Sequence, residues 1–83
     1  MKAINWTPSA LKGIKKAPAN IRKNIRTKML QYAENPESLR NNVKKLQGRE
    51  ASYRLRVGDY RVIFSEDGTV IDVIRVAPRS NAY

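Results

Sequence analysis

The sequence predicts an α+β fold in which an N-terminal strand and a helical hairpin pack on one face of a small antiparallel sheet. Three observations support this prediction: apolar residues at helical spacing near the N-terminus, period-two alternation in the C-terminal half, and turn-forming pairs between the alternating segments. The chain has 83 residues. That length is enough for one domain, residues 1–83, with a core of two layers.

The N-terminal part contains a predicted strand and two predicted helices. Residues 2–6 alternate as a short strand does, and Thr7-Pro8-Ser9 is a helix-start signal. A second helix is predicted from Pro18 to Glu34, where a helical stripe of apolar residues faces a core. The stripe consists of Ile21, Ile25, Met29 and Tyr32. Because the connection at Ala17-Pro18 is very short, we expect the helices to form an antiparallel hairpin.

The C-terminal part is predicted to be a meander of strands. Residues 36–48 are polar, and we expect them to be irregular. Strands are predicted at residues 50–57, 60–65 and 70–76. The turn signals Gly58-Asp59 and Asp67-Gly68 separate them, so we expect these three strands to pair antiparallel. The helices should cover one face of this sheet and leave the other exposed.

The charge of the chain indicates a phosphate-rich partner. Lys and Arg number 17 against 7 Asp and Glu, a net charge of +10. Such a balance is typical of nucleic-acid binders, RNA above all, although a solvated surface, an anionic membrane or an acidic protein would also fit it. The sequence has no Cys and no His. We therefore expect no disulfide, no metal and no cofactor.

Nothing in the sequence predicts export or membrane insertion. The first six residues lack the long apolar run of a signal peptide, and no stretch approaches the ~20 apolar residues of a membrane span. We therefore expect a cytoplasmic protein without a membrane partner.

The strand at residues 50–57 carries the most informative pattern. Side chains alternate across a strand, so Glu50, Ser52, Arg54 and Arg56 share one face. Two arginines on an open face repel each other mildly, and they become favourable when an anion lies across them. The alternative interpretation is an ordinary solvated strand face.

Other basic residues lie near this strand in the sequence. They are Lys44, Lys45, Arg61, Arg75 and Arg79. Which way Arg61 faces cannot be decided, because both faces of its strand carry apolar groups. Arg75 interrupts an apolar strand, which is also common at sheet edges. Tyr83 follows Arg79 at the C-terminus, where an aromatic residue can simply be frayed.

Three segments resemble the RelE/ParE toxins of type II toxin–antitoxin systems. They are Lys45-Leu46-Gln47-Gly48, residues 53–64 (YRLRVGDYRVIF) and residues 76–83 (VAPRSNAY). The resemblance covers essentially the whole chain, and the ending resembles the RelE branch. It implies a RelE-like microbial RNase fold. It also implies a metal-independent endoribonuclease that cuts mRNA in the ribosomal A site by attack of a 2′-hydroxyl on the adjacent phosphorus.

The resemblance assigns roles to individual residues. It implies catalytic roles for Arg54, Arg56, Arg61, Arg79 and Tyr83. Many relatives have Lys at the two strand positions, and Arg effectively cannot deprotonate. The arginines can therefore hold the phosphate and stabilise charge, while the base is expected to be Glu50 or Tyr83.

Further roles concern the leaving group and the RNA. We expect Lys45 or Arg61 to assist the leaving group. RNA binding is expected from Lys44, Lys45, Arg54, Arg56 and Arg75. Many relatives carry a His at the position of Pro78, so this chain lacks that route to acid–base help.

Two other functions stay open at this point. A ParE-like chain would inhibit DNA gyrase, and a non-catalytic chain would be a basic RNA- or ribosome-binding module. The expected partners are the ribosome and mRNA, an acidic RelB-like antitoxin that covers the basic face, and operator DNA bound through the toxin–antitoxin complex.

Overall fold

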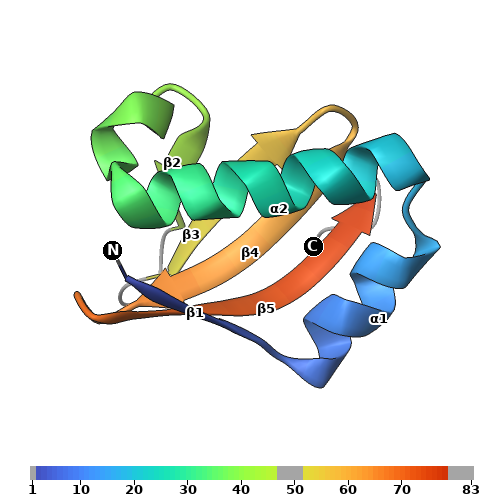
Figure 1. Cartoon of the computed structure of the whole chain (residues 1–83), viewed down its shortest axis with the longest axis horizontal. Coiled ribbons are helices and arrows are strands. Elements are labelled where there is room, and N and C mark those ends of the chain that lie inside the picture. Colours follow the sequence, from blue (N-terminus) through green and yellow to red (C-terminus); the bar gives the residue numbers. More distant parts are fainter. Residues whose placement is uncertain (1, 47–51, 79–83) are drawn as a thin grey trace.

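The structure is a computed structural model that describes residues 2–46 and 52–78. Over these residues, five strands form one sheet in the order β1-β5-β4-β3-β2, and the helices pack against it (Figure 1). The strands are β1 (Ala3–Trp6), β2 (Val43–Lys45), β3 (Ser52–Val57), β4 (Tyr60–Glu66) and β5 (Val70–Pro78). The helices are α1 (Pro8–Lys16), α2 (Ala19–Glu34) and the 3-10 helix η1 (Pro36–Leu39). The predicted α+β class is confirmed.

The first strand makes the sheet mixed. β1 pairs in parallel with β5, from Ala3 opposite Val70 to Trp6 opposite Val73. Figure 1 shows these two segments, from opposite ends of the chain, side by side. The other neighbouring strands pair antiparallel, as predicted for β3, β4 and β5. The predicted antiparallel sheet is thus correct for these three strands, and β1 adds a parallel edge to it.

Both predicted turns form where the sequence placed them. Gly58 has φ +56° and Gly68 has φ +99°, conformations that glycine adopts without steric cost. Asp67 fixes the second turn, because its carboxylate accepts hydrogen bonds from the backbone N–H groups of Thr69 and Val70. These bonds lower the pKa of Asp67.

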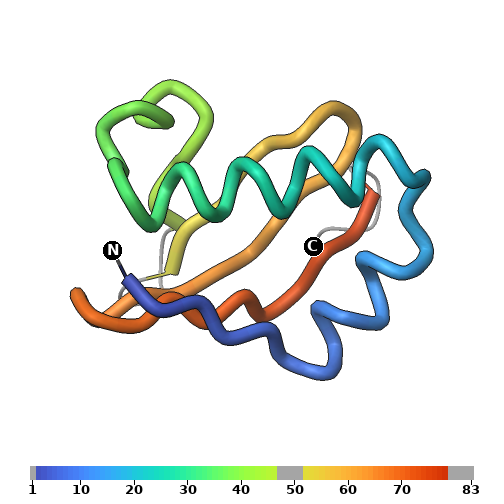
Figure 2. Tube along the Cα trace, in the orientation of Figure 1, coloured from blue at the N-terminus to red at the C-terminus, as the bar shows by residue number. Residues whose placement is uncertain are grey.

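Local signals set the ends of the helices. The Thr7 hydroxyl accepts a hydrogen bond from the Ala10 N–H at 3.2 Å, and Pro8 occupies the first turn of α1. α2 ends at Glu34, before Asn35-Pro36. The helices follow each other directly but splay apart from their short connection (Figure 2). α1 packs beside β5, and α2 packs against β1 and β3.

The segment predicted to be irregular, residues 36–48, is described up to residue 46, and the prediction was wrong for two parts of it. Leu39 in η1 is buried in the core. β2 pairs antiparallel with β3, with Lys44 opposite Arg54 and Lys45 opposite Tyr53. A three-residue strand with two lysines shows no readable alternation. It forms because an edge of β3 is available for pairing, and that is a tertiary effect.

The core lies between the helices and the inner face of the sheet. Phe64 is fully buried there. The Tyr32 ring packs edge-on against it with 5.0 Å between the ring centroids, and the Tyr53 ring stacks on it with 5.5 Å between the centroids. At one end of the core, the Tyr32 hydroxyl donates a hydrogen bond to Glu66 at 2.8 Å, and Lys2 pairs with the same carboxylate. Burial and this bond raise the pKa of Tyr32. In residues 2–46 and 52–78, no helix is both long enough and apolar enough to cross a membrane.

Candidate functional site

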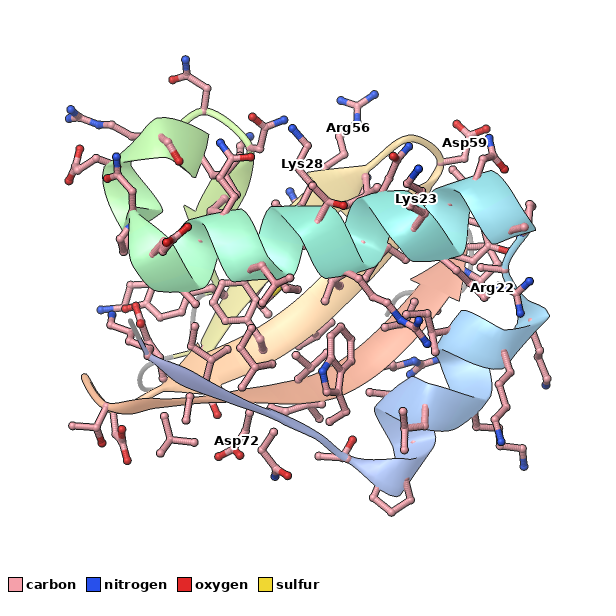
Figure 3. All side chains as sticks on the ribbon, in the orientation of Figure 1. Arg22, Lys23, Lys28, Arg56, Asp59 and Asp72 are labelled. Atoms are coloured by element: carbon pink, nitrogen blue, oxygen red, sulfur yellow. The ribbon has the colours of Figure 1, made fainter. Side chains whose placement is uncertain are left out.

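The outer face of the sheet presents the arginines that the sequence singled out. On β3, Leu55 and Val57 are buried against the helices, while Arg56 is exposed and Arg54 half-buried. This confirms the predicted alternation. Figure 3 shows the Arg56 side chain extending outward from the end of β3, clear of the ribbon.

Strand register settles the direction of Arg61. Arg61 lies directly opposite Arg56 in the β3–β4 ladder, so both side chains are on the outer face. Directly opposite residues have Cβ atoms about 4.5–5.5 Å apart, and like charges at that separation destabilise a sheet. The pair is therefore poised for an anion, because one phosphate between the two guanidinium groups turns repulsion into attraction.

A second row of cations runs beside this pair. In register across four strands lie Lys44, Arg54, Ile63 and Arg75. Arg75 reaches this row because of a β-bulge. Phe64 is paired with Val73 and Ile63 with Arg75, which leaves Ile74 as the extra residue. Without the bulge, Arg75 would share the buried face of Val73, two residues before it.

The two rows border a groove on the outer face. The groove has a volume of about 510 Å³, and its cationic lining consists of Lys44, Arg54, Arg56 and Arg61. Gly58, Asn41 and Asn42 complete the lining, and no described acidic residue is part of it. The Arg56 N–H donates to the Asn42 carbonyl at 3.1 Å, which fixes the loop before β2 against β3. Sequence reasoning missed the two asparagines because it missed β2.

Not every predicted residue joins this groove. Lys45 lies opposite Tyr53, whose ring stacks on Phe64 in the core, so Lys45 is on the helix side of the sheet. Glu50, Arg79 and Tyr83 lie outside the described residues, and their roles stay predictions. Within residues 2–46 and 52–78, acidic side chains form no cluster of three or more that could hold a metal ion.

The groove is suited to binding and polarising a phosphodiester. Arginine guanidinium groups present fixed forks of donors that match phosphate oxygens. Preorganised cations of this kind stabilise the additional charge that develops when a nucleophile attacks phosphorus. Arginine effectively cannot deprotonate in a protein, so the three arginines of this groove account for phosphate binding and charge stabilisation.

Comparison with known proteins relates this chain to toxins of toxin–antitoxin systems. Residues 4–83 match the family described as ParE toxin of type II toxin–antitoxin system. Toxin RelE3 of Methanocaldococcus jannaschii is 34% identical over 86 aligned positions, covering 100% of this chain and 96% of that protein.

Solved structures agree with these sequence matches. In the RelB–RelE antitoxin–toxin complex of Methanococcus jannaschii, a chain superposes with a TM-score of 0.78 at 31% identity, covering 95% of this chain and 94% of that one. In the RelE–RelB complex of Pyrococcus horikoshii the TM-score is 0.80 at 26% identity, covering 98% of each chain.

Proposed function

Since this chain belongs to the RelE/ParE family of type II toxin–antitoxin toxins, we propose that it is a ribosome-dependent endoribonuclease that cuts mRNA. The observation that supports this best is the groove on the outer face, where Arg56 and Arg61 lie directly opposite each other. Two guanidinium groups at one point offer several N–H donors to the oxygens of a single phosphodiester.

The reaction is a metal-independent transesterification. The 2′-oxygen attacks the adjacent phosphorus as its proton passes to the base, and the bond from phosphorus to the 5′-oxygen breaks. The 5′-oxygen leaves with its charge stabilised by arginine and takes a proton from water, which gives a 2′,3′-cyclic phosphate and a 5′-hydroxyl. Arg54, Arg56 and Arg61 bind the phosphate oxygens and stabilise the charge of the transition state. The ribosome orients the mRNA, so positioning contributes much of the rate.

Proton transfer is assigned on the family resemblance and on the sequence. Glu50 or Tyr83 accepts the proton of the 2′-hydroxyl, and Arg79 adds a further positive charge. Arg61 is a better partner for the leaving oxygen than Lys45, since Lys45 lies on the helix side of the sheet. Cleavage at the wild-type rate by both Glu50→Gln and Tyr83→Phe would contradict this assignment of the base.

The partners follow from the same surface. RelE chains from two archaea were solved in complex with RelB antitoxins. A RelB-like antitoxin for this chain would be acidic and would cover the basic face, ordering as it binds. The toxin–antitoxin complex would bind its operator DNA. The proposed site of action is the cytoplasm, where mRNA and ribosomes are.

A purified cell-free translation system tests the proposal. The mRNA ends are mapped by primer extension after addition of wild-type protein or Arg79→Ala. The proposal predicts ribosome-dependent cuts within A-site codons that the variant fails to make. Intact mRNA with normal protein synthesis would contradict it.

Gyrase inhibition is the second candidate, because the matched family is described by its ParE members. A gyrase inhibitor would leave mRNA intact and would trap cleaved supercoiled DNA in the presence of gyrase and ATP. A non-catalytic ribosome-binding module would give neither product, although it would still sediment with ribosomes.

A further inference from the structure

A second hollow lies between α1 and the C-terminal half of β5. β1 ends opposite Val73, so the rest of β5 is flanked by α1 (Figure 2). The hollow has a volume of about 450 Å³. Three cations line it, Lys12, Lys16 and Arg75, and the rest of its lining is largely apolar, with Tyr60 and the segment Val76–Pro78. None of its lining residues is acidic.

One glycine brings the lysines to this position. A Cβ added to Gly13 would lie 1.9 Å from the Val76 carbonyl oxygen, so only glycine allows α1 to approach β5 this closely. Glycine inside a helix costs about 1 kcal/mol relative to alanine. Lys12 and Lys16, four residues apart, project from the same helix face at this contact.

The charges and the floor together fit a nucleotide. Like charges four residues apart destabilise a helix slightly, and an anion between them removes that cost. The exposed lysines Lys12 and Lys16 offer donors to a phosphate. Tyr60, which is half-buried against the core, and Pro78 offer apolar surface against which a base can stack. The volume lies within the roughly 300–1,000 Å³ typical of small-ligand sites.

One residue links the hollow to the cationic row of the outer face. Arg75 lies in the cationic row that crosses the sheet, and it also lines the hollow. An RNA strand leaving the groove across β4 and β5 therefore arrives at Lys12 and Lys16 without meeting an acidic lining residue.

We propose that this hollow binds one nucleotide of single-stranded RNA beyond the cleaved step, with its phosphate on Lys12 and Lys16 and its base on Tyr60. This inference rests on the proposed ribonuclease function and adds a second subsite to it. The subsite would hold the strand at two points and so fix the position of the scissile phosphate over the arginines.

Binding of a fluorescent 2′-O-methyl RNA dodecamer, measured by anisotropy over a range of salt, tests the subsite. This RNA has no free 2′-hydroxyl and cannot be cleaved by the proposed reaction. Lys12→Gln/Lys16→Gln is compared with Lys15→Gln/Lys23→Gln, which removes the same charge from exposed positions outside the hollow.

The variant Lys12→Gln/Lys16→Gln, the hollow pair, should bind this RNA about tenfold more weakly than wild type. It should also reduce the magnitude of the slope of log K against log salt by about 0.7, the value for one phosphate contact on a single strand. The control pair should stay within twofold of wild type. Equal losses in the two pairs, or no binding by wild type, would overturn the proposal. Tyr60→Leu should weaken binding with an unchanged salt slope, because stacking involves no counterion release.

Three further outcomes separate the alternatives. Polyglutamate of equal charge should compete far less well than the RNA, and equal competition would show that the hollow recognises charge alone and would overturn the nucleotide assignment. Tight RNA binding that depends on Lys12 and Lys16, without cleavage of normal mRNA, would refute the ribonuclease proposal but leave the subsite standing. Cleavage unaffected by the hollow pair, with unchanged RNA binding, would do the reverse.

Discussion

Replacement of Gly13 by alanine changes both helix propensity and packing, and these two effects change the free energy of unfolding in opposite directions. In an unconstrained helix interior, glycine to alanine stabilises by about 1 kcal/mol. Here the new Cβ would lie 1.9 Å from the Val76 carbonyl oxygen and 3.2 Å from the Val76 Cβ. Backbone atoms give way little, so α1 has to retreat by about 1 Å to reach the 3.0 Å that real Cβ atoms keep.

That retreat uncovers the part of the core that α1 supplies. Ala10 is fully buried and Ile14 is 2% exposed, and both lose contact with the sheet when α1 moves. Overpacking of this kind typically costs 1–3 kcal/mol. Allowing for the gain of about 1 kcal/mol in propensity, we expect Gly13→Ala to lower the free energy of unfolding by up to about 2 kcal/mol. In a domain of this size, each kcal/mol shifts Tm by about 4–8 °C.

Urea unfolding followed by circular dichroism measures this change. Lys15→Ala is the matched control, since Lys15 is exposed on the same helix and its replacement barely changes helix propensity. The midpoint should fall for Gly13→Ala with an unchanged m-value, and it should stay in place for the control. A rise of about 1 kcal/mol in Gly13→Ala would refute the close approach of α1 to β5.

Three further predictions follow from the outer face and the core. Arg56→Glu should abolish cleavage, and it should leave the free energy of unfolding unchanged or raise it by roughly 0.2–1 kcal/mol, because a carboxylate then lies opposite Arg61. Cleavage and urea unfolding are measured on the same sample. A fall of more than about 1 kcal/mol in the free energy of unfolding would contradict this prediction. Lys44→Ala should weaken binding to RNA, whereas its neighbour Lys45→Ala should not, since the two lie on opposite faces; equal losses in anisotropy would refute the assigned register. Tyr32→Phe should cost about 1 kcal/mol at neutral pH through the lost hydrogen bond. Because the pKa of Tyr32 is raised in the folded state, this hydroxyl adds stability that is fully present below the unfolded pKa of about 10 and is lost at higher pH. The stability of Tyr32→Phe should therefore fall less steeply above pH 10 than that of wild type. Parallel curves of stability against pH for the two proteins would contradict this.

Local sequence signals predicted most of the fold. The Thr7-Pro8 start, the Asn35-Pro36 stop and the turns at Gly58 and Gly68 all depend on short-range backbone chemistry. β2 could not be predicted, because its three residues become a strand only by pairing with β3. The parallel pairing of β1 with β5 is likewise a long-range contact, and no local sequence pattern predicts it.

The candidate site was predictable in composition but not in arrangement. Alternation placed Arg54 and Arg56 on one face, and the structure confirms this. The face on which Arg61 lies is set by the β3–β4 register, and the face on which Arg75 lies is set by the bulge at Ile74. Neither feature is indicated by a sequence pattern. Lys45 is a lysine like its neighbour Lys44, but it lies on the other face of the sheet.

Single-turnover cleavage on ribosomes programmed with a defined A-site codon tests the central claim most directly. Arg56→Ala is compared with Lys23→Ala, which removes the same charge from the exposed surface of α2 (Figure 3). If the groove stabilises the transition state, Arg56→Ala should lower the rate by about 10²- to 10³-fold, the usual effect of losing one such donor, while Lys23→Ala should stay within about threefold of wild type. Equal and small losses in the two variants would show that only net charge matters and would contradict the assignment of the outer face as the cleavage site.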